Sequence, residues 1–119
     1  MKTIKTKTFG LAVYEKGDPN SSKIAIVIPG RLDTKDYIHN TSLVDYLAGR
    51  GYFALSFDPP GTWESSGDIS LYTTTNMIKS VDELIEFLGN KPAILAGHSR
   101  GGTIAMLAGP KNSYVTHII

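Results

Sequence analysis

The sequence contains no cysteine, which excludes disulfide bonds, thiolate metal sites and a catalytic thiol. It also has no apolar run that approaches the roughly 20 residues that a bilayer-spanning helix needs. The N-terminal segment lacks the apolar stretch of a secretory signal. From these absences we expect a cytoplasmic protein that does not interact with a membrane.

An excess of either charge is missing as well. The 119 residues include 12 Lys and Arg and 11 Asp and Glu, for a formal net charge of +1, so the composition predicts no nucleic-acid partner. Lys2, Lys5 and Lys7 alternate on an expected N-terminal strand, where we expect them to face water. We expect no cofactor and no bound metal ion.

The hydrophobic pattern predicts strands and helices in alternation. Apolar residues alternate around Gly10 at Ile4, Phe9, Leu11 and Val13, which is typical of a half-buried antiparallel hairpin. Uniformly apolar runs favour strands covered on both faces, as in a parallel sheet. We expect such strands at residues 24–28, 53–57 and 93–96, and a further strand over residues 114–119. Apolar residues at helical spacing predict helices around residues 43–48, 77–88 and 103–108, the last apolar on every side.

This order of elements predicts an α/β fold with a mostly parallel sheet, right-handed crossovers and helices on both faces, preceded by an antiparallel hairpin. The polar stretch of residues 58–67 is expected to form a loop. The length fits one domain, and no linker divides the chain.

One motif points to chemistry. The run Gly97-His98-Ser99-Arg100-Gly101 has the pattern Gly-x-Ser-x-Gly and lies between a buried strand and an apolar helix, the setting of a nucleophile elbow. A serine at the apex of so tight a turn has a strained backbone. Gly97 and Gly101 lack the Cβ atoms that would collide across it, and Gly102 would allow the helix to approach the strand. The helix N-terminus would direct unpaired N–H groups at the reacting centre.

Two glycine-rich nucleotide-binding motifs do not match this run. A dinucleotide-binding fingerprint needs glycine where Ser99 stands, and a phosphate-binding loop needs Gly-Lys-Ser or Gly-Lys-Thr. The flanking strand and helix also argue against a glycine-rich turn with an incidental serine. Ser99 is therefore the candidate nucleophile.

The sequence resembles the α/β-hydrolase superfamily along essentially its whole length, most specifically in Ala-Gly-His-Ser-Arg-Gly-Gly at residues 96–102. The pair Pro29-Gly30 after the first buried strand resembles the serine esterase and aminopeptidase-like group. The resemblance implies acyl transfer from a small-molecule or peptide ester, thioester or amide, with Ser99 as nucleophile. It also implies an oxyanion hole formed by the backbone N–H of Arg100 and that of Arg31, with Leu32 as the alternative.

The resemblance also implies a catalytic acid and then a histidine after the serine. Residues 100–119 contain no Asp or Glu and a single histidine, His117, which falls in an expected strand. We therefore expect residues 1–119 to be a single, incomplete α/β-hydrolase domain, its N-terminal half, truncated in the strand after the elbow helix and inactive by itself. The alternative is a mature short chain that acts as a non-catalytic binding or assembly module on the same scaffold.

The remaining candidates are expected to be structural. His98 should pack beside the motif, and His39 should be a solvated loop residue, although it could border the pocket. Trp63 and Tyr37 could line an acyl pocket but more often such aromatic residues belong to a core. The Arg31 and Arg100 side chains could bind a substrate carboxylate, yet arginines beside an elbow form surface or structural pairs as often.

A loop after the second buried strand resembles the family pattern Asp-x-Arg-Gly-x-Gly-x-Ser. Here it starts at Asp58, but Pro60 replaces the arginine and Trp63 the second glycine. We therefore expect a structural salt bridge of the family to be missing. Asp58 is expected to cap a turn rather than to act as the catalytic acid.

Overall fold

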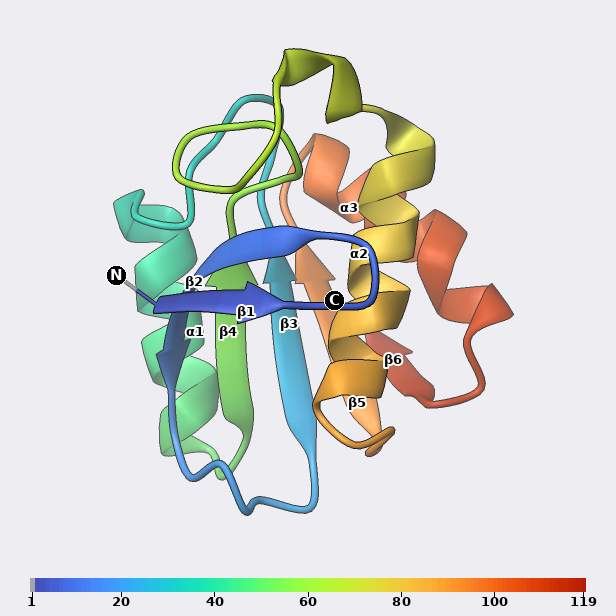
Figure 1. The fold of residues 1–119 in the computed structure, drawn as a ribbon. Helices are drawn as coiled ribbons and strands as arrows, with labels where there is room; N and C mark the ends of the chain where they lie inside the picture. The colour runs from blue at the N-terminus through green and yellow to red at the C-terminus, as the bar shows by residue number, and fades with distance from the viewer. Residues whose placement is uncertain (1) are drawn as a thin grey trace.

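A computed structural model describes residues 2–119 as a six-stranded mixed sheet with helices on both faces (Figure 1). The strands are β1 (Lys2–Lys5), β2 (Gly10–Lys16), β3 (Ile24–Ile28), β4 (Phe53–Phe57), β5 (Ala93–Gly97) and β6 (Val115–Ile118). The helices are α1 (Ile38–Gly49), α2 (Thr74–Phe87) and α3 (Arg100–Ala108), with short 3-10 turns at Ile69–Leu71 and Gly109–Lys111. This architecture confirms the predicted fold class.

The strands lie in the order β1-β2-β4-β3-β5-β6. The β1–β2 and β2–β4 pairs are antiparallel, whereas β4, β3, β5 and β6 run parallel. Every residue of β3 and β4 is buried, as expected for parallel strands covered on both faces. In the hairpin, Ile4, Phe9, Leu11 and Val13 are buried, and Lys2, Lys5 and Lys7 are exposed, as the alternating pattern predicted.

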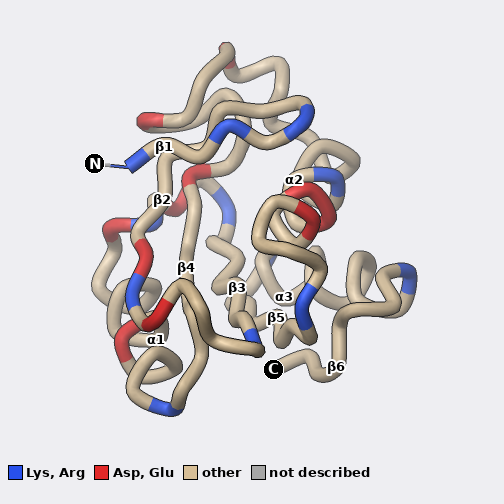
Figure 2. The backbone as a smooth tube through the Cα atoms, turned by 60° about the horizontal axis from the view of Figure 1, so that its bottom comes forward, with Lys and Arg blue, Asp and Glu red and all other residues tan. Residues whose placement is uncertain are grey.

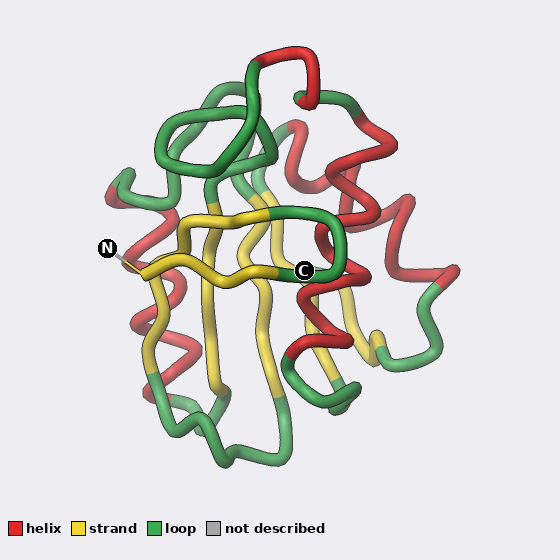
Figure 3. The backbone as a smooth tube through the Cα atoms, in the orientation of Figure 1, coloured by secondary structure: helices red, strands yellow, loops and turns green. Residues whose placement is uncertain are grey.

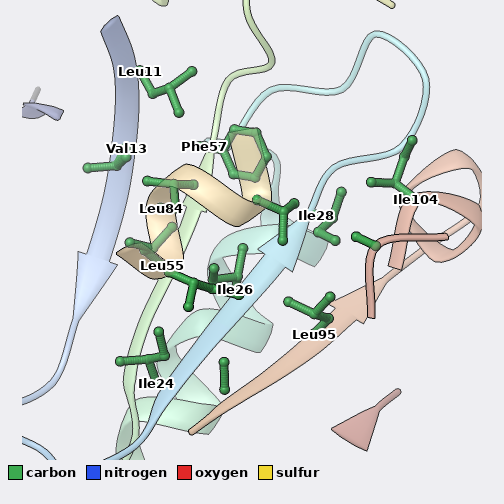
Figure 4. Close-up of a cluster of buried hydrophobic side chains, with 14 of the residues drawn as sticks. Leu11, Val13, Ile24, Ile26, Ile28, Leu55, Phe57, Leu84, Leu95 and Ile104 are labelled. Atoms are coloured by element: carbon green, nitrogen blue, oxygen red, sulfur yellow. The ribbon is translucent and has the colours of Figure 1, made fainter. Parts of the chain in front are cut away.

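Two apolar layers hold the helices against the sheet. Ile24, Ile26 and Ile28 of β3 point to the side of α2 and α3, where they join the larger core cluster (Figure 4). Ala25 and Val27, between them in the sequence, belong to a smaller cluster under α1. Since successive strand residues point to opposite faces, one fully apolar strand supplies both layers.

The hairpin is attached to α2 through Glu83, whose side chain is almost fully buried. One carboxylate oxygen accepts hydrogen bonds from the Thr6 hydroxyl at 2.8 Å and the Thr8 N–H at 2.7 Å, and the other accepts from the Thr8 hydroxyl at 2.6 Å. Burial by itself raises the pKa of Glu83, but the hydrogen bonds from Thr8 and Thr6 stabilise the charged form and lower the pKa below its usual value. The ionised carboxylate therefore ties the β1–β2 connection to the helix.

Two details differ from the sequence-based expectation. Helix α3 buries only one face, so Met106 is 68% and Leu107 42% exposed although an apolar helix packed on every side was predicted. Helix α1 begins at Ile38, which places His39 in its first turn and not in the preceding loop. Apolar composition alone did not show how many neighbours α3 has. No helix within residues 2–119 is long and apolar enough to cross a bilayer.

Candidate active site

The loops that follow β3, β4 and β5 meet at the carboxyl end of the parallel strands (Figure 3). Ser99 lies there, between β5 and α3, with φ of 57° and ψ of −121°. A positive φ is unusual for a residue with a side chain and stores on the order of 1–3 kcal/mol of strain. The Ser99 side chain is exposed, and its hydroxyl forms no hydrogen bond with any of residues 2–119.

The glycines around Ser99 occupy positions where a Cβ atom has no room. A Cβ on Gly97 would lie 2.2 Å from the carbonyl carbon of Gly101, and one on Gly101 would lie 2.1 Å from the carbonyl oxygen of Ile28. At Gly102 the closest approach would be a looser 3.3 Å, to the Gly97 oxygen. The first two glycines therefore allow α3 to start directly above the ends of β3 and β5.

Two backbone N–H groups, one in the elbow and one in the loop after β3, have no acceptor among the described residues. The Arg100 N–H is the first of α3, and neither it nor the Arg31 N–H donates to an acceptor within residues 2–119. The loop after β3 lies against the elbow, since a Cβ on Gly30 would be 3.3 Å from the His98 carbonyl oxygen. The Leu32 N–H, by contrast, donates to the Tyr72 hydroxyl at 2.9 Å. Of the Arg31 and Leu32 donors, only that of Arg31 is available to a ligand.

The Arg100 side chain is engaged away from the elbow. Its guanidinium donates to the Thr74 hydroxyl at 2.8 Å and lies 5.5 Å from the centroid of the Tyr72 ring. Tyr72 thus contacts both Arg100 and the Leu32 N–H. The Arg31 side chain, in contrast, is exposed. This arrangement gives the Arg100 side chain a structural contact and leaves its backbone N–H free.

Asp58 is completely buried and organises two loops. It accepts hydrogen bonds from the Thr34 hydroxyl at 2.7 Å, the Lys35 N–H at 2.9 Å and the Glu64 N–H at 3.1 Å. The Lys35 ammonium, only 2% exposed, lies 3.0 Å from the second carboxylate oxygen. A salt bridge to Asp58 is therefore present, and its cation is a lysine from the loop after β3. Pro60, which stands where the family pattern has arginine, takes no part in it.

Three carboxylates stabilise the positive charge of the Lys35 ammonium. Its ammonium also contacts Glu64 at 2.7 Å and Asp36 at 3.1 Å. Burial lowers the pKa of Lys35, but the hydrogen bonds to Glu64, Asp58 and Asp36 outweigh this effect and raise the pKa above its usual value. No sequence signal identified Lys35, since a loop lysine is most often exposed.

Trp63 and Tyr37 lie outside the core, and neither lines the cavity beside the elbow that is described below. Trp63 is 59% and Tyr37 43% exposed, and their rings meet edge to face with centroids 6.3 Å apart. The Trp63 indole N–H donates to the Leu32 carbonyl oxygen at 3.1 Å. Trp63 therefore fastens the loop after β4 to the loop that carries Arg31.

A cavity of about 470 Å³ opens beside the elbow, on the α1 face of the sheet. Its walls are mostly apolar, and its polar groups come from the first turn of α1 and from the elbow. The lining residues are Val27, His39, Asn40, Leu43, Ala96, Gly97, His98 and Ile119. His39 therefore borders a pocket, the second of the two roles that the sequence allowed for it.

The histidines do not complete a catalytic triad with Ser99. His39 lies 2.7 Å from Asp33, His98 is exposed beside His39, and His117 lies on β6 with its ring nitrogen 3.0 Å from the Thr116 hydroxyl. None of them is hydrogen-bonded to Ser99. Helix α3 and strand β6 carry no acidic residue (Figure 2). Residues 100–119 thus supply no acid for the chain order of serine, acid and histidine.

The family model described as alpha/beta hydrolase fold matches residues 25–118. No curated protein matches the chain.

Solved structures match the fold closely at low sequence identity. Est1E from Butyrivibrio proteoclasticus, with ferulic acid bound, superposes with a TM-score of 0.83 and 21% identity over 99% of this chain and 51% of its own. A thioesterase domain from the curacin biosynthetic pathway superposes with a TM-score of 0.81 and 22% identity, over 98% of this chain and 43% of its own. Alpha/beta hydrolase domain-containing protein 10 from mouse superposes with a TM-score of 0.80 and 23% identity, over 98% of this chain and 47% of its own. The chain spans about half the length of these structures.

Proposed function

The chain belongs to the alpha/beta hydrolase fold family, and we propose that it carries the nucleophile of a serine hydrolase that transfers the acyl group of an ester, thioester or amide to water. The observation that carries this proposal is the backbone of Ser99, with φ of 57° at the start of α3. Such a turn presents an exposed hydroxyl next to unpaired N–H groups. The thioesterase domain among the similar structures supports this substrate class.

In the proposed reaction, the Ser99 oxygen attacks the carbonyl carbon of the substrate while its proton passes to a base. The carbonyl oxygen becomes negatively charged and accepts hydrogen bonds from the backbone N–H groups of Arg31 and Arg100. When this intermediate collapses, the bond from the carbonyl carbon to the leaving group breaks, the base returns the proton to that group, and an alcohol, thiol or amine departs and leaves an acyl-serine. Water then attacks the acyl-serine, which releases the acid and restores the Ser99 hydroxyl.

The base and its acidic partner are placed outside residues 1–119 in this proposal. The family's chain order puts both after the serine, and residues 100–119 offer only His117, on a strand. We accordingly propose that residues 1–119 form the N-terminal half of one hydrolase domain, and that activity requires the other half.

The test is covalent labelling with a fluorophosphonate probe. It is applied to the product of the whole reading frame that encodes residues 1–119, and the labelled residue is identified by mass spectrometry. We expect an adduct on Ser99, its loss in Ser99→Ala, and its retention in Ser113→Ala, which removes another exposed serine. A folded product without an adduct at Ser99 would contradict the proposal and favour the non-catalytic module.

A further inference from the structure

Three potential metal ligands meet at the edge of the cavity. Asp33 comes from the loop after β3, His39 from the first turn of α1 and His98 from the elbow. The atoms that they could offer to an ion lie within 4.8 Å of one another. His39 and Asp33 are already in contact at 2.7 Å, and the ring centroids of the two histidines are 5.6 Å apart.

We propose that Asp33, His39 and His98 bind a divalent transition-metal ion of the zinc class. Two imidazoles and one carboxylate form a ligand set suited to Zn²⁺, and three protein ligands leave a fourth position for water or another oxygen ligand. Bond lengths near 2.1 Å in a tetrahedral site separate the ligand atoms by roughly 3.4 Å. The ligand atoms that lie farthest apart, at up to 4.8 Å, therefore need to approach by up to about 1.4 Å, whereas the Asp33–His39 pair at 2.7 Å needs to open slightly. Rotation of the two exposed histidines provides both movements.

The surroundings favour a site rather than a chance cluster. Asp33 is positioned by the Gly30 N–H, which donates to its carboxylate at 3.1 Å. The buried Asn40 side chain donates to the Thr34 carbonyl oxygen at 2.9 Å and so holds this loop against α1. Hydrogen bonds from neighbouring groups of this kind fix the orientation of residues that bind a metal ion. The adjoining cavity has room for a fourth ligand.

The candidate metal site lies next to the elbow, but the proposal that it binds a metal ion does not require Ser99 to be catalytic. His98 directly precedes Ser99, so a bound ion would place positive charge beside the proposed nucleophile. The sequence predicted no metal, because Asp33, His39 and His98 are spread over three segments and form no recognisable ligand spacing. Only the arrangement of the loops brings them together.

Calorimetric titration of the product of the whole reading frame with Zn²⁺, in a buffer free of chelators, tests the proposal. We expect one ion to bind per chain, and binding to weaken at least about tenfold in each of Asp33→Asn, His39→Asn and His98→Asn. His117→Asn is the matched control, because it removes the third histidine of residues 1–119, which is exposed on β6 and lies outside the cluster. It should bind as the unchanged chain does. Circular dichroism establishes that each variant is folded.

Cobalt provides a second readout that does not depend on heat. Co²⁺ in a four-coordinate site absorbs strongly in the visible range, so the unchanged chain and His117→Asn should gain this absorption and His39→Asn and His98→Asn should not. Saturable binding that survives in both of these variants would overturn the proposal. So would the absence of saturation up to about 1 mM Zn²⁺, which would leave His39 and Asp33 as a hydrogen-bonded pair only.

Discussion

The Lys35 ammonium and the Asp58 carboxylate lie 3.0 Å apart, at a place where the lysine side chain is 2% and the aspartate side chain 0% exposed. The pair connects the loop after β3, which carries Arg31, to the loop after β4. Removal of one partner from such a pair leaves the other charge buried without compensation. The ion pair should therefore determine the stability of the loops next to Ser99.

Lys35→Met is expected to lower the free energy of unfolding by about 3 kcal/mol, because it leaves the Asp58 carboxylate buried without a cation. Urea denaturation measures the change. Lys5→Met, at an exposed lysine of β1, is the control and should stay within about 0.5 kcal/mol. Addition of Asp58→Asn to Lys35→Met should restore part of the loss. Equal stabilities of Lys35→Met and Lys5→Met would contradict the role assigned to the pair.

Gly101→Ala should destabilise the protein by about 2 kcal/mol or more, since the added Cβ would lie 2.1 Å from the Ile28 carbonyl oxygen and would force α3 away from β3. Gly49→Ala provides a matched comparison, because a Cβ there has no atom within 4 Å. That variant should be neutral or slightly more stable, as alanine favours helix. Thermal unfolding of both variants measures the difference, and similar melting temperatures would count against the steric argument.

Acidification should weaken the attachment of the hairpin to α2. The fold lowers the pKa of Glu83 below its usual value of 4.5. Its stabilisation is therefore complete above that value and is lost as the pH falls through the lower pKa of the folded state. At neutral pH, Glu83→Gln should be less stable than the unchanged protein by about 1 to 2 kcal/mol. This difference in the free energy of unfolding between Glu83→Gln and the unchanged protein should become smaller towards acidic pH.

Urea denaturation at a series of pH values measures this difference for Glu83→Gln. Glu86→Gln, at an exposed position of the same helix, is the control and should change the stability at neutral pH by less than about 0.5 kcal/mol. A difference for Glu83→Gln that stays constant on acidification would show that the Glu83 carboxylate does not carry the attachment.

A single introduced thiol can report the electrostatics of the elbow, since the chain has no cysteine of its own. In Ser99→Cys the N-terminus of α3 should lower the pKa of the thiol and increase the thiolate fraction. A pKa lower by one unit gives about tenfold more thiolate of somewhat lower nucleophilicity, so alkylation by iodoacetamide should be about threefold faster.

Ser113→Cys is the reference for this measurement, because Ser113 is also exposed but lies outside the helix. The comparison needs no catalytic base, so it examines the elbow independently of the triad. A thiol that reacts no faster in Ser99→Cys than in Ser113→Cys would mean that the helix end does not stabilise negative charge at this position.

The sequence predicted the fold because the faces of a strand or helix that are buried determine which of its positions are apolar. A strand covered on both faces is apolar at every position, and the run from Ile24 to Ile28 could be recognised from this property alone. The elbow could be recognised for a different reason: only glycine fits at positions 97 and 101, so steric constraint is visible in residue type. Where composition did not specify the neighbours, as at Met106 and Leu107, the prediction of complete burial was wrong.

Local sequence therefore determined the order of strands and helices and the turn that presents Ser99. The tertiary structure decided which residues of the loops and of the first turn of α1 meet. These pairs are Lys35 with Asp58, Tyr72 with the Leu32 N–H, and Asp33 with His39 and His98. The physical reason is that these contacts join side chains whose spacing along the chain follows no period. They form only after the parallel strands have brought their carboxyl ends to one edge of the sheet.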